Sequence, residues 1–160
     1  MVDKIMVDTN ILLYAYDRGE PVKQPKALAA LDLLATRRLG VLTAQVLAEF
    51  FVNATRKLDP PLTVDEAYER IQNYLFAWEV VDITGPIVLE AVRGARTHQI
   101  AYWDAQIWAA ARLNQIPVVF TEDFNVGAAI ETVRFVNPLA VDFDLHSWAS
   151  AEIAGMGANP

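Results

Sequence analysis

The chain has 160 residues, of which 54% are hydrophobic and none is cysteine, and its net charge is −7. This length suits one domain with a sizeable core, and without cysteine the chain has no disulfide framework and no thiolate metal site. The acidic balance argues against a basic nucleic-acid coat, charges break every hydrophobic run short of the roughly 20 residues of a membrane span, and no signal peptide is recognisable, so we expect a soluble, cytoplasmic protein.

The first half of the chain alternates short apolar runs with longer helical patterns. Residues 4–7 predict a strand, and residues 10–16 predict a short helix. Leucines at helical spacing from Leu28 to Leu39 predict a second helix, which Gly40 ends. The stretch "GVLT" then predicts a short strand, and "AQVLAEFFVNATRKL" predicts another helix.

The second half continues the alternation. Thr63 and Glu66 have the spacing of a capping box at the start of a helix. The run "WEVVDI" predicts a strand, and the helix after it begins near Pro86. A helix over "YWDAQIWAAARLN" and strands at "IPVVFT" and "ETVRFV" complete the pattern. Strands separated by helices of this length imply βαβ units and a mostly parallel sheet.

The pattern fades after Pro138. We therefore assign one domain to residues 1–138 and a C-terminal extension to residues 139–160, which we expect to be partly disordered, above all at "AGMGANP". Within the extension, Phe143, Leu145 and Trp148 predict that its first part docks on the domain.

Four acidic residues fall near the positions where such a sheet binds ligands, beyond the carboxyl ends of its strands. Asp8 directly follows the first strand, and Asp123 comes soon after "VVF". Asp104 lies in the first turn of a predicted helix, and Glu49 lies between apolar neighbours inside another. Asp104 and Glu49 reach the same edge of the sheet only if the helices that contain them start at that edge.

Each acid also has a purely structural interpretation. Asp8 or Asn10 is suited to cap the helix after it, and Asp104 to interact with its helix dipole. The stretch Thr121-Glu122-Asp123 is suited to cap a helix over "FNVGAAI". Glu49 shares one stripe of its helix with other polar residues, and this stripe is either a solvated face or the wall of a polar cleft. The stripe comprises Gln45, Glu49, Asn53 and Arg56.

Gathered carboxylates without a basic partner would repel one another and raise each other's pKa. A hard divalent cation removes this repulsion, and ligands that are all oxygen favour Mg²⁺ or Mn²⁺ over Zn²⁺. Two such ions, about 4 Å apart, can hold both the attacking water and the leaving oxygen of a phosphodiester. On this interpretation Asp8 is a metal ligand that Thr9 and Asn10 support by hydrogen bonds.

The stretches "VDTNILLYAYD", "QVLAEFF", "YWDAQIWAAA" and "VVFTEDF" resemble, in order and spacing, the acidic motifs of PIN-domain nucleases. The similarity is greatest to the VapC-type toxins of bacterial toxin–antitoxin pairs, and it covers residues 4–138. It implies a three-layer α/β/α sandwich with a mostly parallel central sheet. It also implies an endoribonuclease that uses Mg²⁺ or Mn²⁺, with RNA as substrate, a cognate antitoxin protein as partner, and a homodimeric state.

The resemblance also assigns individual residues. The acids that match the catalytic and metal-binding positions of the family are Asp8, Glu49, Asp104 and Asp123. Asn10 and Thr121 match polar residues that orient a ligand carboxylate or a water. Glu122 lies beside Asp123, and the Thr-x-Asp spacing of the family favours Asp123 as the ligand.

Two further groups allow alternative interpretations. Arg93, Arg96 and His98 either guide RNA phosphates toward the metal ions or form an ordinary exposed helix end. Trp103 and Trp108 flank Asp104, and we expect both in the core rather than as stacking platforms for bases.

Two other functions remain as alternatives. A Mg²⁺-dependent phosphohydrolase with Asp8 as nucleophile is disfavoured, because Asn10 stands where a second acid is usual and no lysine follows Lys57. A PIN-like binding or regulatory module without catalysis is disfavoured because such a module has no reason to keep four mutually repelling carboxylates.

Overall fold

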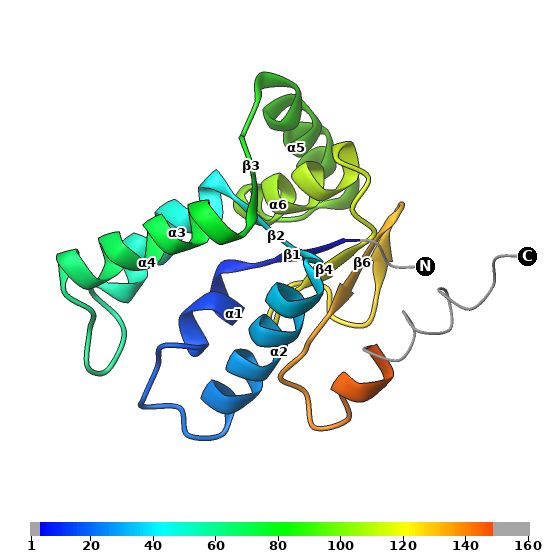
Figure 1. Ribbon diagram of the computed structural model, residues 1–160. Coiled ribbons are helices and arrows are strands. Elements are labelled where there is room, and N and C mark those ends of the chain that lie inside the picture. The colour runs from blue at the N-terminus through cyan, green and yellow to red at the C-terminus, as the bar shows by residue number, and fades with distance from the viewer. Residues whose placement is uncertain (1–3, 149–160) are drawn as a thin grey trace, which may run out of the picture.

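The computed structural model describes residues 4–148, and within them six strands form one sheet in the order β3-β2-β1-β4-β6-β5 (Figure 1). The strands are β1 (Ile5–Val7), β2 (Gly40–Thr43), β3 (Glu79–Val81), β4 (Val118–Phe120), β5 (Ala129–Ile130) and β6 (Val133–Val136). All neighbouring pairs are parallel except β5 and β6, which are antiparallel. The predicted mostly parallel sheet is confirmed.

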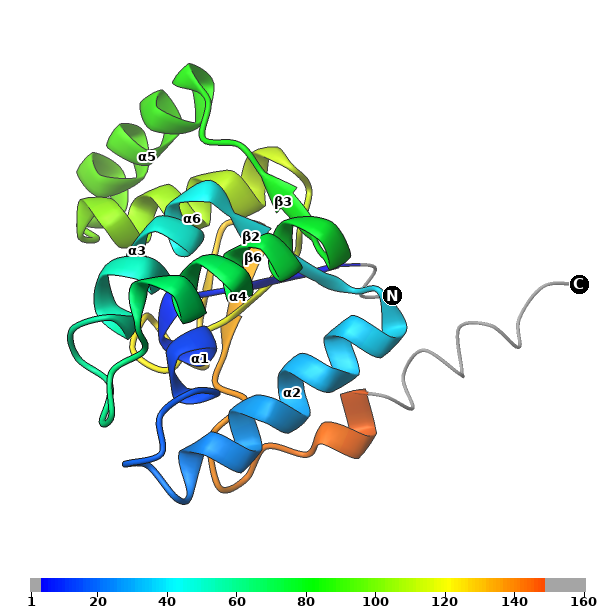
Figure 2. The ribbon, with the colours of Figure 1, turned by 60° about the vertical axis from the view of Figure 1, so that its left-hand side comes forward.

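Helices flank this sheet on both faces, as the α/β/α prediction requires (Figures 1 and 2). The labelled helices of the described residues are α1 (Thr9–Tyr14), α2 (Lys23–Arg37), α3 (Ala44–Ala54), α4 (Val64–Ala77), α5 (Gly85–His98) and α6 (Tyr102–Leu113). The connections from β1 through β2 to β3 contain α1 to α4, and the right-handed rule for such crossovers places all four helices on one face. The connection from β3 back to β4 carries α5 and α6 over the other face.

The core lies between the central strands and the two helical layers. Met6, Val7 and Val119 in the two central strands are fully buried. Trp108 of α6 is also fully buried, and its ring lies against Gly94 of α5. A Cβ atom at position 94 would come within 2.4 Å of the indole, so the close packing of α5 on α6 requires glycine there.

Gly40 has a different role from the predicted one. Helix α2 ends at Arg37, and Arg38 adopts the left-handed conformation that terminates it, with φ of 55°. Gly40 is instead the first residue of β2, where an added Cβ would lie 2.1 Å from the ring of Trp78. The prediction that Gly40 ends the helix is therefore wrong, whereas the predicted strand over "GVLT" is confirmed. The ring of Trp78, at the end of α4, is what requires a glycine at this position.

The segment after β4 also differs from expectation. No helix forms over "FNVGAAI": residues 122–127 make turns, and Asn125 and Gly127 have positive φ values of 43° and 83°. The two-residue strand β5 follows and pairs with β6 across a turn at Glu131, whose φ is 53°. The alternative that Thr121-Glu122-Asp123 caps a helix is thus wrong, and β5 is too short to have produced a recognisable pattern.

The predicted helix starts at Thr63 and near Pro86 are confirmed. The Thr63 hydroxyl accepts a hydrogen bond from the Glu66 amide at 3.1 Å, and the Glu66 carboxylate accepts one from the Thr63 amide at 2.7 Å. Thr84 caps α5, and Pro86 lies in its first turn. These local signals fix where α4 and α5 begin.

The first part of the C-terminal extension docks on the sheet, as predicted. The rings of Phe143 and Trp148 pack against Phe120 of β4, with centroid distances of 5.8 and 5.3 Å. The predicted disorder of "AGMGANP" lies outside the described residues, and the boundary at Pro138 stays a prediction. Within residues 4–148, none of the helices has the length and apolar character needed to cross a membrane.

Candidate active site

Asp8 lies at the carboxyl end of β1, in the middle of the sheet. Its backbone amide donates to the Phe120 carbonyl at 2.9 Å, which extends the pairing of β1 with β4. Its side chain accepts hydrogen bonds from the Thr9 amide at 2.7 Å and from the Thr121 hydroxyl at 2.8 Å. Asp8 therefore caps α1, as the structural interpretation proposed, and its second carboxylate oxygen is held by the end of β4.

The environment of Asp8 disfavours its charge. Only 8% of its surface is exposed, and burial raises the pKa of the carboxyl from the ordinary 3.8 to about 6. The hydrogen bonds from Thr121 and Thr9 act in the opposite direction, whereas the charges of Asp104 and Glu49 raise the pKa further. Three acids from three different elements thus interact electrostatically at this edge of the sheet.

Glu49 faces α1 from the neighbouring helix α3. One of its carboxylate oxygens accepts a hydrogen bond from the Thr9 hydroxyl at 2.7 Å, and the other accepts one from the Gln45 amide at 2.8 Å. Arg56, at the far end of the predicted polar stripe, is exposed beyond the end of α3. Gln45 and Glu49, at the N-terminal end of the stripe, therefore line a polar site and do not form a solvated face.

Asp104 lies in the first turn of α6, where the sequence predicts it, and is half-buried. Burial raises its pKa, and the charges of Glu49 and Asp123 add to this effect. Among residues 4–148 no hydrogen bond or ion pair reaches its carboxylate. Asp104 thus differs from Asp8 and Glu49, whose oxygens are already held by neighbouring donors.

Asp123 joins the same group from the loop after β4. The Asn10 side-chain amide donates to its carboxylate at 3.3 Å and to the Thr121 hydroxyl at 3.4 Å. The Asn10 carbonyl in turn accepts a hydrogen bond from the Glu122 backbone amide at 3.3 Å. Asn10 and Thr121 therefore connect Asp8 to Asp123, which is the arrangement expected of two orienting residues.

Glu122 has a separate partner. Its side chain forms an ion pair with Lys23 at the start of α2, with 2.5 Å between Nζ and Oε1. Its charge is compensated there, whereas Asp123 takes the hydrogen bond from Asn10. This difference favours Asp123 over its neighbour as the acid of the site.

A chain of buried amides lies behind the acids, and sequence reasoning missed most of it. The Gln106 amide donates to the Gln45 carbonyl oxygen at 2.8 Å, and the Tyr102 hydroxyl donates to Gln106 at 2.9 Å. The Gln45 amide also donates to the backbone carbonyl of Trp103 at 3.1 Å. A signal was present, because Gln106 interrupts an apolar run in which a buried amide must find a partner.

The donor atoms suit a hard divalent cation, although the acids are not gathered around one point. Among the described residues, no three His, Asp or Glu side chains form a group compact enough to hold an ion as they stand. The site nevertheless consists of carboxylate, hydroxyl and amide oxygens, and no described cation pairs with its four acids. Mg²⁺ fits such a set because it keeps several waters and needs few direct protein ligands.

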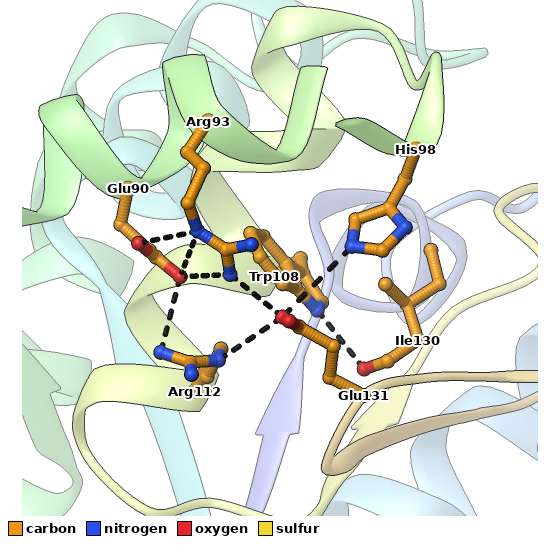
Figure 3. A network of polar contacts seen from close by, with 7 residues as sticks. All are labelled: Glu90, Arg93, His98, Trp108, Arg112, Ile130 and Glu131. Atoms are coloured by element: carbon orange, nitrogen blue, oxygen red, sulfur yellow. Dashed lines mark hydrogen bonds and ion pairs between the residues drawn. The ribbon is translucent and has the colours of Figure 1, made fainter. Parts of the chain in front are cut away.

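Arg93 and His98 belong to a separate polar network between α5, α6 and the β5–β6 turn (Figure 3). The Arg93 guanidinium pairs with Glu90 and Glu131, and Arg112 pairs with the same two carboxylates. These contacts neutralise Arg93, so neither a phosphate guide nor a simple exposed helix end describes it. Arg96 is exposed near the end of α5, and its proposed contact with RNA stays a prediction.

The two tryptophans beside Asp104 have opposite environments. Trp108 is fully buried, as expected, and its indole N–H donates to the Ile130 carbonyl at 3.1 Å. Trp103 keeps 62% of its surface exposed, so the prediction that it lies in the core is wrong. Trp103 precedes Trp108 by five residues, which is about 140° around α6 at about 100° per residue, and it therefore does not share the face that Trp108 buries.

Comparisons with known proteins agree with this fold. A family model described as "PIN domain" matches residues 5–129. A toxin–antitoxin complex from Klebsiella pneumoniae contains a chain with 21% identity and a TM-score of 0.62, over 84% of this chain and 98% of the other. VapC20 of Mycobacterium tuberculosis, described as a toxin that cleaves the sarcin–ricin loop, has 19% identity and a TM-score of 0.62, over 76% and 92% of the two chains.

A DNA-bound VapBC structure from Salmonella typhimurium is also similar, with 18% identity and a TM-score of 0.60 over 84% of this chain and 98% of the other. No curated protein matches the chain. At these identities the solved structures establish a shared fold, and the residues of the site have to be judged on their own geometry.

Proposed function

Because the chain belongs to the PIN domain family, we propose that it is an endoribonuclease that depends on Mg²⁺ or Mn²⁺. The observation that carries the proposal is the electrostatic coupling at the end of β1. Asp8 is held there by two hydrogen bonds, and its pKa is raised by burial and by the charges of Asp104 and Glu49. A site of this kind suits a bound dication.

Each residue of the site has a role in this proposal. The four acids Asp8, Glu49, Asp104 and Asp123 would hold the ions. Bound Mg²⁺ or Mn²⁺ would activate a water for attack on a phosphodiester and offset the charge that develops on the leaving oxygen. The hydroxyls of Thr9 and Thr121 fix the carboxylates of Glu49 and Asp8, and Asn10 fixes that of Asp123.

We also propose that the chain is the toxin of a toxin–antitoxin pair in the cytoplasm. The similar chain from K. pneumoniae comes from a complex described as toxin–antitoxin, and the one from S. typhimurium comes from a structure described as DNA-bound VapBC. Both chains are matched over almost their whole length. A cognate antitoxin protein and a second copy of this chain are therefore the partners we expect. RNA is the proposed substrate, and the residues of the site do not define its sequence.

Cleavage of RNA by purified variants tests the nuclease proposal. We expect Asp8→Asn and Asp104→Asn each to lower the rate at least about 100-fold with Mg²⁺ or Mn²⁺ present, and we expect a chelator to abolish wild-type cleavage. Asp32→Asn, which changes an exposed acid on α2, is the matched control and should stay within about twofold of the wild type. Undiminished cleavage by both site variants would overturn the proposal.

One observation favours the alternative of a catalytically silent binding module. The acids of the described residues do not form a compact group as they stand. Calorimetric titration with Mn²⁺ separates the two functions, because the nuclease proposal requires saturable binding that Asp8→Asn weakens. Absence of any binding heat, together with absence of RNA cleavage, would favour the silent module.

A further inference from the structure

Trp103 has a large exposed aromatic surface, and it is the sequence neighbour of Asp104, an acid of the proposed site. It lies in the first turn of α6, one residue before Asp104, and is 62% exposed. Single exposed hydrophobic side chains are common and need no explanation by themselves. Trp103 is different because a buried side chain holds its backbone carbonyl and the ring of Tyr102 packs against its indole.

Gln45 ties Trp103 to the acids. The side-chain amide of Gln45 donates to Glu49 at 2.8 Å and to the Trp103 carbonyl at 3.1 Å. One buried side chain therefore fixes both an acid of the site on α3 and the residue that carries the exposed indole on α6. Hydrogen bonds within the protein therefore set the distance between Glu49 and the backbone of Trp103.

Tyr102 contacts the indole of Trp103 directly. The rings of Tyr102 and Trp103 meet edge to face, with centroids 5.0 Å apart. The Tyr102 hydroxyl donates to Gln106, which in turn donates to Gln45. The ring of Tyr102, against which the indole packs, is thus joined to Glu49 by a continuous chain of hydrogen bonds through Gln106 and Gln45.

Because the protein is acidic, a contact with RNA that does not depend on charge would strengthen RNA binding. The net charge is −7, and Lys23, Arg93 and Arg112 are already paired with glutamates. At this net charge, the protein as a whole attracts RNA phosphates weakly at long range. Stacking of a base on an aromatic ring does not depend on net charge, and every base presents a suitable face.

We propose that Trp103 is a stacking platform for one unpaired base of a single-stranded RNA, held in fixed register with the acidic site by Gln45. This role rests on the nuclease function proposed above and adds a residue that positions the substrate. In this role Trp103 would accept any of the bases, because each has a face that can stack. It would, however, require that a base be present at one position relative to the cleaved bond.

Cleavage kinetics give the first readout. Trp103→Ala and Trp103→Leu should lower kcat/KM at least about 10-fold, whereas Trp103→Phe should keep most of the activity, because an aromatic face is what the role requires. Phe76→Ala is the matched control, since Phe76 on α4 is 95% exposed and should not affect cleavage. Equal activity of the Trp103→Ala variant and the wild type would overturn the proposal and leave the nuclease function intact.

Binding in an Asp104→Asn background gives a second readout that does not depend on cleavage. A fluorescent single-stranded RNA of about 12 nucleotides is titrated with Asp104→Asn and with the double variant that also carries Trp103→Ala. We expect the double variant to bind at least about 10-fold more weakly. An abasic nucleotide at one position should weaken binding by Asp104→Asn and leave that of the double variant unchanged.

The two readouts separate the possible failures. Weaker RNA binding by the double variant supports the stacking role even if the wild type does not cleave, whereas equal binding overturns it whatever the cleavage result. A change of sedimentation coefficient in Trp103→Ala, with unchanged RNA binding, would also overturn it and would assign the indole to a contact between protein chains.

Discussion

At the scale of single residues, the site holds each acid differently. Asp8 is buried and accepts two hydrogen bonds, Glu49 is bonded through both oxygens, and Asp123 is exposed and bonded by Asn10. Asp104 has no partner among the described residues. Removing a charge should therefore have different structural consequences at the four positions, although all four are proposed to hold the same ions.

Asp8→Asn should stabilise the metal-free protein near pH 7. The pKa of Asp8 is about 6 in the fold and 3.8 ordinarily, so its charge opposes folding fully above pH 6 and not at all below pH 3.8. The free energy of unfolding should rise by up to about 3 kcal/mol at pH 7 and by nothing near pH 3. Urea denaturation at pH 7 and near pH 3, in the presence of a chelator and with Asp32→Asn as control, measures the change in unfolding free energy. An equal gain in stability at the two pH values would contradict the prediction.

Thr121→Val should destabilise the fold and disturb the site together. The Thr121 hydroxyl donates to Asp8 in a fully buried position, and valine would leave that carboxylate oxygen without its donor. We expect a loss of about 1–3 kcal/mol in unfolding free energy at pH 7. Thr121→Ser keeps the hydroxyl and should stay closer to the wild type. Equal stability of the valine and serine variants in thermal melts would exclude the proposed bond.

At the scale of elements, the sequence predicted most of the helices and strands. Apolar runs and caps located β1, β4, α4 and α5 because those signals are local to each element. The sequence also placed Asp8 and Asp123 at one edge, since Asp8 directly follows β1 and Asp123 lies in the loop just after the parallel strand β4. The positions of Glu49 and Asp104 depend on how α3 and α6 pack, which no local pattern determines.

The missed features share the same physical cause. Gly40 and Gly94 are required by rings from other elements, Trp78 and Trp108, and these contacts are remote in the chain. The bond between Gln45 and Gln106 joins residues 61 positions apart. The prediction that Trp103 lies in the core was wrong because an aromatic side chain does not by itself show which face of α6 other elements cover.

Gly94→Ala should disrupt the packing of α5 on α6. The added methyl group would lie 2.4 Å from the ring of Trp108, which is fully buried and cannot move away. We expect a loss of about 1–3 kcal/mol in unfolding free energy. Gly85→Ala, at the start of α5, has no atom within 4 Å of the new methyl group and is the matched control. Chemical denaturation that shows no difference between the two variants would contradict this packing.

At the scale of the whole molecule, an acidic chain is proposed to act on a polyanion. The net charge is −7, and the described part of the chain leaves its four site acids without a cationic partner. Bound dications would reverse the charge locally, at the one place where substrate has to bind. Stability, metal binding and substrate binding should therefore be linked in this protein.

Mn²⁺ should stabilise the wild type against thermal unfolding. A ligand that binds only the folded state at 100 times its Kd adds about 2.7 kcal/mol, which corresponds to a shift of roughly 5–11 °C for a chain of this size. Asp8→Asn should start from a higher midpoint without metal and gain little from Mn²⁺. Equal shifts in the two proteins would show that the ions stabilise the fold from another position.

The most direct test is calorimetric titration of Mn²⁺ into the wild type and into Asp104→Asn at pH 7. Asp104 has no hydrogen-bond partner among the described residues, so this substitution should leave the fold unchanged while removing an oxygen ligand. We predict saturable binding by the wild type that is at least about 10-fold weaker in the variant. Binding of equal strength in the two proteins, or no binding by the wild type, would contradict a metal site built from these acids.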